Sequence, residues 1–238
     1  MEAPGPRQAV TFDEGAEFST ITIDDGKVNA LSLSILAEVN LALDQALRAD
    51  VPVIITGRDG RFSAGFDLGT LTGGGPDAPT LLRRGFELAE RMLSFSLPVV
   101  VACSGHAIAM GSFLLLSADV RIGAEGEFKI GANEVSIGMT MPTAAIELCR
   151  LRIPTTHLSR VLSNAEMFSP SGAVGAGFLD AVASPADLGS RAAAAAATLG
   201  RVDLAAHAAT KLLWRAPALS AISAGIESDH AAFTRLIA

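Results

Sequence analysis

Charge is scarce in this chain of 238 residues. Charged residues make up only 18% of it, the formal net charge is −7, and no long run of lysine or arginine occurs. Attraction to the phosphates of nucleic acid or to an anionic membrane surface needs clustered basic residues. The sequence therefore excludes general binding to either, and an anionic ligand would have to meet local basic residues.

Long apolar stretches are missing as well. The longest runs, such as residues 97–103, are much shorter than the about 20 residues that a membrane-spanning helix needs. Residues 1–6 contain two prolines and no apolar core, so we expect no signal peptide. These features predict a soluble, cytoplasmic protein with no membrane partner.

Several motifs of common catalytic sites are absent. Cys103 and Cys149 lie in apolar surroundings without Cys-x-x-Cys spacing, which predicts two buried, reduced thiols. The four histidines are dispersed, so the sequence predicts no metal site. It has no Gly-x-x-x-x-Gly-Lys loop, and Ser112 lacks the second glycine of a hydrolase nucleophile turn. We therefore expect neither a P-loop nucleotidase nor a serine hydrolase.

What the sequence does have is a large apolar fraction. Half of the residues are apolar and the mean hydropathy is +0.41, which would leave a monomer short of polar surface, so we expect an oligomer. Residues 53–56 and 99–103 are apolar or β-branched without alternation, as in strands buried on both faces of a parallel sheet. With the helical spacing of leucines in residues 80–94, they predict a strand–helix–strand unit of an α/β fold.

Local signals indicate the remaining elements. Ser32 or Ser34 can cap a helix that follows it, and residues 158–168 and 171–177 predict two more helices. Residues 69–79 are rich in glycine and proline and predict a loop, which either acts as a lid or only faces solvent.

The last quarter of the chain is rich in alanine. Residues 192–197 are six consecutive alanines, the composition that most favours a helix, and two or three further helices are expected after them. We therefore divide the chain into a core of residues 1–185 and a helical region of residues 186–238.

Two stretches place glycine and small residues at the end of an apolar run. They are residues 61–68 and 105–113, and at such points the chain can turn sharply and expose backbone N–H groups to a ligand. We interpret the two turns as the holders of one substrate carbonyl oxygen. The chain must then also supply a base.

Glu134 is the candidate base. It is the one carboxylate within the apolar or small residues 130–138, where burial would raise its pKa toward the range of a general base. The alternative is a structural carboxylate that caps a nearby helix. Glu147 is better explained by a pair with Arg150 on the polar side of a helix. His106 lies in the second turn, where a packing role is favoured over a catalytic one.

Four segments in a fixed order resemble one family. They are residues 27–31, residues 62–68, residues 98–111, and residues 118–138, which hold an Ala-Asp-Val-Arg sequence, Phe128, Glu134 and Gly138. Together they are similar to the crotonase superfamily, the enoyl-CoA hydratase/isomerase family, over about residues 18–182. Each segment alone is weak, but four in this order and spacing are highly specific.

The resemblance implies an α/β fold, a spiral of repeated ββα units. It also implies that the C-terminal helical region covers the site and packs on a neighbouring subunit, in a trimer or a dimer of trimers. The substrate would be an acyl-CoA thioester, so that coenzyme A is part of the substrate and no separate cofactor is needed. The oxyanion hole would be the backbone N–H groups of Phe66 and Met110.

Further residues would border the substrate and coenzyme A by their positions in the family motifs. These residues are Lys27, Val28, Ala30, Ala64, Asp67, Gly111 and Phe113. Which basic residues meet the coenzyme A phosphates is left open among Lys27, Arg58 and Arg61.

Phe113 is the informative departure from the family pattern. Family hydratases carry a glutamate at its position and a second one at Glu134, whereas family 3-enoyl-CoA isomerases have an apolar residue at the first. The resemblance therefore implies a double-bond shift with Glu134 as the catalytic acid/base, and we expect Phe113 to lie opposite it. Two alternatives stay open. One is a hydratase in which Glu134 works alone or with His106 or Glu147, and the other is an acyl-CoA-binding protein that has lost its chemistry.

Overall fold

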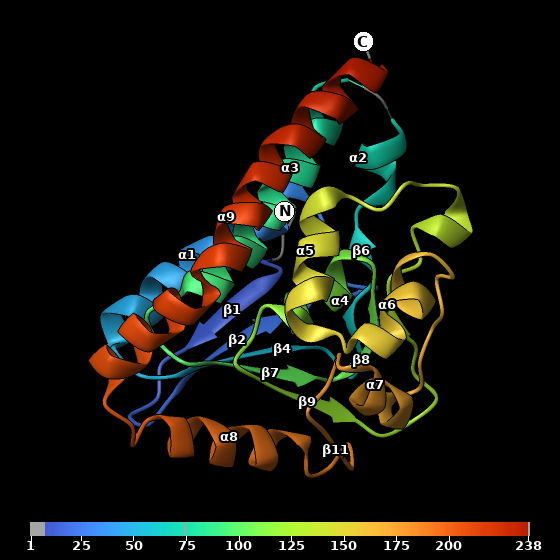
Figure 1. Ribbon diagram of the computed structural model, residues 1–238. Coiled ribbons are helices and arrows are strands. Elements are labelled where there is room, and N and C mark those ends of the chain that lie inside the picture. Colours follow the sequence, from blue (N-terminus) through green and yellow to red (C-terminus); the bar gives the residue numbers. More distant parts are fainter. Residues whose placement is uncertain (1–7, 74, 238) are drawn as a thin grey trace, which may run out of the picture.

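The computed structural model describes residues 8–73 and 75–237 (Figure 1). The opening segment, on which the signal-peptide expectation rests, lies outside them, as do Gly74 and Ala238. The centre of the fold is a six-stranded sheet in which β1 runs antiparallel to β2 and the other neighbours are parallel. In spatial order the strands are β1 (Val10–Asp13), β2 (Ser19–Ile23), β4 (Val53–Gly57), β7 (Val99–Cys103), β9 (Val120–Ala124) and β11 (Ala181–Ala183).

A second set of short strands continues from the first. β4 leads into β5, β7 into β8 and β9 into β10, and these three form their own sheet in the order β10-β8-β5. β3 and β6 form a further parallel pair. Along the chain, a helical segment follows each long strand and its short continuation, so the chain repeats the ββα unit that the resemblance implied. The short strands are β3 (Ala30–Leu31), β5 (Gly60–Ser63), β6 (Gly65–Phe66), β8 (Gly105–Ile108) and β10 (Ile130–Gly131).

Helices cover both faces of the six-stranded sheet, with α8 alone beneath it in Figure 1. Ile55 and Val101 join the cluster under α1 and α3, whereas Val100 packs with Ala192 and Ala196 of α8. Burial on both faces explains why these strands lack polar alternation. The helices are α1 (Leu33–Ala49), α2 (Leu68–Thr72), α3 (Asp77–Ser94), α4 (Met110–Leu116), η1 (Val135–Ile137), α5 (Thr143–Arg152), α6 (Thr155–Leu162), α7 (Pro170–Ala176), α8 (Leu188–Leu199) and α9 (Leu204–Ile237).

Two local predictions need correction. The expected loop of residues 69–79 contains α2, because the Asp67 side chain accepts hydrogen bonds from the backbone N–H and the hydroxyl of Thr70 and caps that helix. The helix expected at residues 158–168 ends at Leu162. The chain then turns through Ala165, which has φ +50°, so that Phe168 can pair with Ile130 in the core. In contrast, Ser32 caps α1 as predicted.

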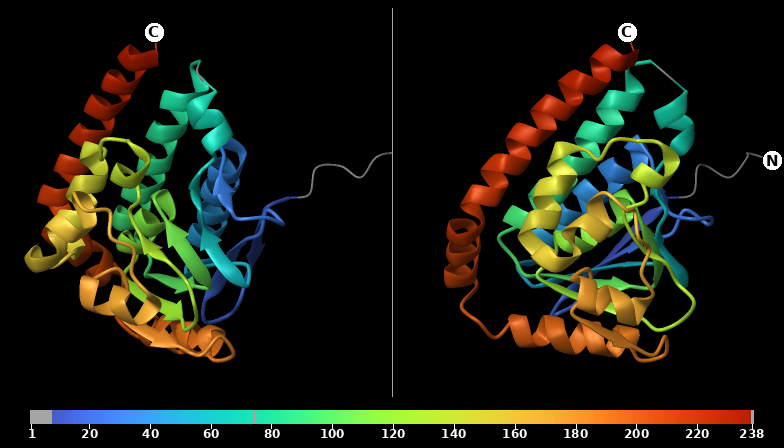
Figure 2. Two further views of the ribbon diagram at one scale, coloured as in Figure 1. Left: turned by 90° about the vertical axis from the view of Figure 1, so that its right-hand side faces the viewer. Right: turned by 45° about the vertical axis from the view of Figure 1, so that its right-hand side comes forward.

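The C-terminal region also differs from expectation. α9 is a single helix of 34 residues with Pro217 inside it, not two or three helices. Proline removes one hydrogen bond of a helix, but α9 packs along α3 and α5 of its own chain (Figures 1 and 2). Arg215 bonds to the carbonyl oxygen of Leu93 before Pro217 and Glu227 pairs with Arg83 after it, so contacts with α3 hold the helix on both sides of the proline. Contact with a neighbouring subunit stays a prediction.

A buried ion cluster fixes the first half of α9. Asp119, at the start of β9, accepts hydrogen bonds from Lys211 at 2.6 Å and from Arg215 at 2.8 Å. The two cations also donate to the carbonyl oxygens of Leu97 and Leu93, near the end of α3. Both cationic side chains are almost fully buried. Each charge is therefore balanced by Asp119 and by carbonyl dipoles.

Among the described residues, no helix combines the length and apolar composition that crossing a membrane requires. Cys103 and Cys149 are buried and unpaired, as predicted.

Candidate active site

The two glycine-containing turns lie against each other. Gly65 has φ +91°, and a Cβ at this position would lie 2.9 Å from both the Cβ of Ala109 and the carbonyl oxygen of Ile108. The same Cβ would lie 3.3 Å from the backbone nitrogen of Met110. Only glycine tolerates both this positive φ and these short distances. The two turns can therefore approach each other only because Gly65 has no side chain.

The N–H of Phe66 faces away from β3. Asp67 donates its N–H to Leu31 in β3, at 3.0 Å, and Gly65 donates to the Ser63 hydroxyl. Successive N–H groups of an extended strand point to opposite sides, so the intervening N–H of Phe66 is left for another acceptor. The Phe66 ring anchors this turn, because it lies where a Cβ on Gly85 of α3 would stand.

The N–H of Met110 opens α4. Ala109 precedes it with φ +51° and ψ −124°, a strained conformation for a residue with a side chain. The Ala109 N–H donates to Gly131 at 3.0 Å, whereas its carbonyl oxygen accepts from Ser112 and Phe113. The N–H groups of the first turn of a helix have no partner within the helix. Met110 and Phe66 thus present N–H groups from two adjoining turns.

Glu134 follows the strand that pairs with the second turn. Gly131 is in register with Ile108, and Glu134 comes three residues later, ahead of η1. Its side chain is 7% exposed, and its Oε2 accepts no hydrogen bond from the described residues. Burial raises the pKa of Glu134 to about 7. The expectation that this carboxyl is buried is confirmed, and the side chain makes no capping bond to η1, the helix that follows it directly.

Phe113 is buried in the core on α4. Its ring packs against Phe86 of α3, with centroids 5.9 Å apart. A position opposite Glu134 stays a prediction.

The other two candidates for acid/base work have structural partners. His106 accepts a hydrogen bond at Nδ1 from the Lys129 N–H at 3.0 Å and meets the Phe128 ring edge-on. Burial, followed by the charges of Arg61 and Lys129, lowers the pKa of His106. Glu147 pairs with Arg150 at 3.3 Å on α5, as predicted.

The residues expected to border coenzyme A lie beside the first turn. Ala30 pairs with Gly65, and the Ala64 N–H donates to the carbonyl oxygen of Val28 at 3.1 Å. Sequence reasoning missed Asn29, which is fully buried between these residues. Its side chain donates to the carbonyl oxygens of Ile23, Arg61 and Phe62 and so joins three segments of chain.

Two of the basic residues that could meet the coenzyme A phosphates, Arg58 and Arg61, already donate hydrogen bonds to backbone carbonyl oxygens. Arg58 donates to the carbonyl oxygen of Lys27 at 2.8 Å and lies 3.6 Å from Asp24. Arg61 donates to the carbonyl oxygen of Gly60. Asp67 caps α2, which lowers its pKa through the bonds from Thr70.

A largely apolar cavity of about 480 Å³ lies next to the Glu134 turn. Met139, in its wall, donates its N–H to the carbonyl oxygen of Glu134 at 2.9 Å. The walls come from α2, α3, the segment before α5 and the end of α9. The lining residues are Leu71, Leu82, Gly138, Met139, Thr140, Met141, Pro142, Asp229, Ala232, Phe233 and Leu236.

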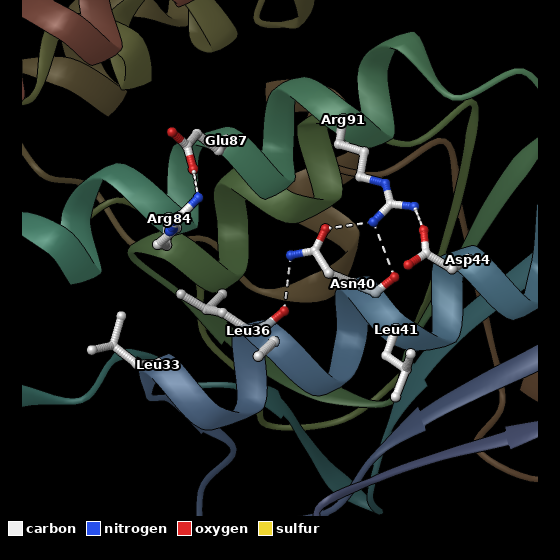
Figure 3. Close-up of a pocket in the computed structure, with 9 residues that line it drawn as sticks. Leu33, Leu36, Asn40, Leu41, Asp44, Arg84, Glu87 and Arg91 are labelled. Carbon is white, nitrogen blue, oxygen red and sulfur yellow. Dashed lines mark hydrogen bonds and ion pairs between the residues drawn. The ribbon is translucent and has the colours of Figure 1, made fainter.

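A larger groove of about 670 Å³ runs between α1 and α3 (Figure 3). Its charged side chains pair with one another, as Arg91 does with Asp44 and Arg84 with Glu87. Its lining includes neither turn and no residue close to Glu134 in the sequence, whereas Gly138 and Met139 in the wall of the smaller cavity follow Glu134 by four and five positions.

Comparison with known proteins decides the family. The family model of enoyl-CoA hydratase/isomerase matches residues 13–238. The chain belongs to the enoyl-CoA hydratase/isomerase family. It is an enzyme with the α/β crotonase fold, and the resemblance seen in the sequence is confirmed.

Solved structures of this family are close to the chain over nearly all of its length. An enoyl-CoA hydratase/isomerase family protein from Pseudomonas syringae is 47% identical, has a TM-score of 0.92 and aligns over 93% of this chain and 96% of its own. An enoyl-CoA isomerase of Mycobacterium tuberculosis is 46% identical, with a TM-score of 0.90 and coverage of 94% and 98%.

One curated relative is named for hydration, the other reaction of the family. A probable enoyl-CoA hydratase of Bacillus subtilis is 33% identical over 165 residues. This match covers 68% of the chain but only 64% of the relative's length. Both reactions therefore occur among the names of similar proteins.

Proposed function

We propose that this enzyme shifts the double bond of a 3-enoyl-CoA to the 2-position, with Glu134 as its acid/base. The observation that carries the proposal is a buried carboxyl, that of Glu134, with a pKa of about 7, on the turn that follows the paired strands β8 and β10. A carboxyl with this pKa is ionised often enough near neutral pH to remove a proton, and it gives the proton back readily.

The reaction needs few groups. The N–H groups of Phe66 and Met110 donate to the thioester oxygen, which lowers the energy of the enolate. Glu134 removes a proton from C2, and the electrons of that C–H bond spread over C2 to C4 and onto the oxygen. The protonated Glu134 then returns the proton to C4, which leaves the double bond between C2 and C3. No atom is gained or lost.

Phe113 favours this reaction over hydration. Addition of water requires that a water molecule be held, deprotonated and aimed, work that two carboxylates share in the family hydratases. In this chain Phe113 is fully buried and apolar at the place of the first carboxylate, and His106 and Glu147 have structural partners. The names of relatives favour neither reaction, because the Mycobacterium tuberculosis protein called an isomerase in one solved structure is called a probable hydratase in another, so the choice rests on Phe113 and Glu134.

The substrate side follows from the cavity. We place the acyl tail in the cavity of about 480 Å³ beside Glu134, and the coenzyme A along Lys27, Val28, Ala30 and Ala64. A homotrimer or dimer of trimers, a cytoplasmic location and independence from a further cofactor remain part of this proposal.

The test uses a 3-enoyl-CoA substrate with Glu134→Gln and a matched control, Glu147→Gln. We expect Glu134→Gln to lower kcat by about 10²- to 10⁴-fold, while Glu147→Gln stays near wild type. If turnover of Glu134→Gln survives within a few-fold, Glu134 is not the base.

The hydratase alternative is tested with crotonyl-CoA. Rapid loss of its conjugated chromophore, without turnover of 3-enoyl-CoA, would favour hydration. Tight binding of acyl-CoA without turnover of either compound would favour a protein that has lost its chemistry.

A further inference from the structure

The first turn of α5 is capped by a residue from another helix. Pro142 precedes α5 and offers no side-chain cap. Instead, the carboxylate of Asp229 on α9 accepts the N–H of Thr143 through Oδ1 and the N–H of Ala144 through Oδ2, each at 3.0 Å. Two of the four N–H groups that a helix start leaves open are therefore bound by α9.

The backbones of α9 and α5 also touch at this point. A Cβ on Gly225 would lie 2.8 Å from the backbone nitrogen of Ala144, so no other residue fits here without a shift. Both views of Figure 2 show the last half of α9 beside α5 and the segment that leads into it. The capping bonds thus belong to a close, fixed contact between the two helices.

α5 is joined to Glu134 through a short segment of chain. Cys149 on α5 is completely buried, and burial together with the charge of Glu134 raises the pKa of its thiol to about 12. The Oε2 atom of Glu134 has no hydrogen-bond donor among the described residues, so packing and backbone must set its position. Residues 138–142 link Glu134 to α5, and Met139 ties the near end of this link to the Glu134 carbonyl.

We propose that Asp229 is a positioning residue, which holds α5 in place from the C-terminal helix and thereby keeps the Glu134 carboxyl in its water-poor site. The inference rests on the proposed role of Glu134 as acid/base. It also assigns α9 a structural role within its own subunit, the positioning of α5.

The loss of Asp229 should have a specific signature. Without the cap, the first turn of α5 loosens and water reaches Glu134. Desolvation is what raises the pKa of Glu134 above 4.5, so this pKa should fall. Cys149 on α5 is coupled to the charge of Glu134, and with a pKa raised to about 12 it stays a neutral thiol near pH 7. The acid limb of the pH–rate profile should therefore move to lower pH.

The kinetic test compares Asp229→Ala and Asp229→Asn with Glu227→Gln. Glu227 lies on the same helix but pairs with Arg83 of α3, so it controls for the loss of a charge on α9. Asp229 also lines the cavity in which we place the acyl tail, so Asp229→Ala should change KM as well as kcat; the mark of positioning is that the acid limb moves down while kcat falls about 10-fold or more. Asp229→Asn keeps one acceptor oxygen and should restore part of both. Glu227→Gln should match wild type. An unchanged acid limb in Asp229→Ala, or an equal shift in Glu227→Gln, would overturn the proposal.

A second readout does not depend on turnover. The rate at which a thiol reagent labels Cys149, located by peptide mass spectrometry, should rise in Asp229→Ala, while labelling of Cys103 in β7 should stay slow. If wild type does not turn over 3-enoyl-CoA, the proposed function fails but this measurement still tests the link from Asp229 to α5. Unchanged labelling of Cys149 would refute that link.

Discussion

Gly65 lies against the backbone nitrogen of Met110. A Cβ on Gly65 would be only 3.3 Å from that nitrogen. The two residues belong to separate ββα units, 45 positions apart in the sequence. We propose that their contact brings the N–H groups of Phe66 and Met110 to one place. The proposed oxyanion hole therefore depends on a residue that contributes no side chain.

The first prediction concerns Gly65→Ala. The new methyl group would meet Ala109 and the Ile108 carbonyl oxygen at 2.9 Å, at a backbone φ of +91° that alanine rarely adopts. We expect a loss of about 1–3 kcal/mol in the free energy of unfolding and a fall in kcat that exceeds the effect on KM. Denaturant unfolding and steady-state kinetics check this. Gly175→Ala, at a position with open space, is the control, and equal effects of both would contradict the argument.

The second prediction concerns how Glu134 makes the free energy of unfolding depend on pH. Its pKa is raised from 4.5 in the unfolded chain to about 7 in the fold, so the folded state binds the proton more tightly. The stability that this provides is complete below pH 4.5 and is lost as the pH rises through 7. Glu134→Gln removes this dependence. We expect it to be more stable than wild type above pH 7, by up to about 3 kcal/mol, although it is inactive.

Thermal or denaturant unfolding across the pH range measures this difference. The two proteins should converge below pH 4.5. A constant difference at all pH values would show that Glu134 is not held in a water-poor site.

The sequence alone was sufficient for features that repeat or that violate a local rule. The strands β4 and β7 lack polar alternation because both faces are buried, and Ser32 stands where a helix start needs a cap. Glu134 was recognisable because a carboxylate among apolar neighbours is costly without a purpose. The ordered motifs then supplied the spiral fold.

Other features join residues that are far apart in the sequence. β3, β6 and β10 have two residues each, too short for any periodicity to show. The two or three helices expected after the alanine run are the single helix α9, which packs on α3 and α5 and continues across Pro217. Likewise, the bonds from Asp229 to the start of α5 span 85 and 86 positions, and no local pattern marks them. Tertiary contacts decided these points.

The third prediction concerns Asp119→Asn. Asp119 balances Lys211 and Arg215, whose side chains are 2% and 3% exposed, so asparagine at this position leaves two buried cations with neutral acceptors only. We expect a loss of about 3–5 kcal/mol in stability, whereas Asp44→Asn at an exposed pair with Arg91 should cost about 1 kcal/mol or less. Denaturant unfolding measures both. Similar small losses would mean that the carbonyl dipoles alone hold these cations.

The last prediction concerns Phe233, which lines the cavity beside Glu134 from the end of α9. Phe233→Ala enlarges that cavity and Phe233→Trp reduces it. For a series of 3-enoyl-CoA substrates, each extra methylene that Phe233→Ala can newly bury should raise kcat/KM by about 4-fold, because burial of one methylene is worth about 0.8 kcal/mol. Phe233→Trp should favour shorter chains.

Leu213→Ala is the control for this series, since Leu213 lies on the same helix with 78% of its surface exposed. A uniform change across all chain lengths in Phe233→Ala would indicate general damage to the fold. A change that grows with chain length in Phe233→Ala and is absent in Leu213→Ala would place the acyl tail against α9. Because α9 lines the cavity of its own subunit, this dependence should persist in any oligomeric state in which the helix stays folded.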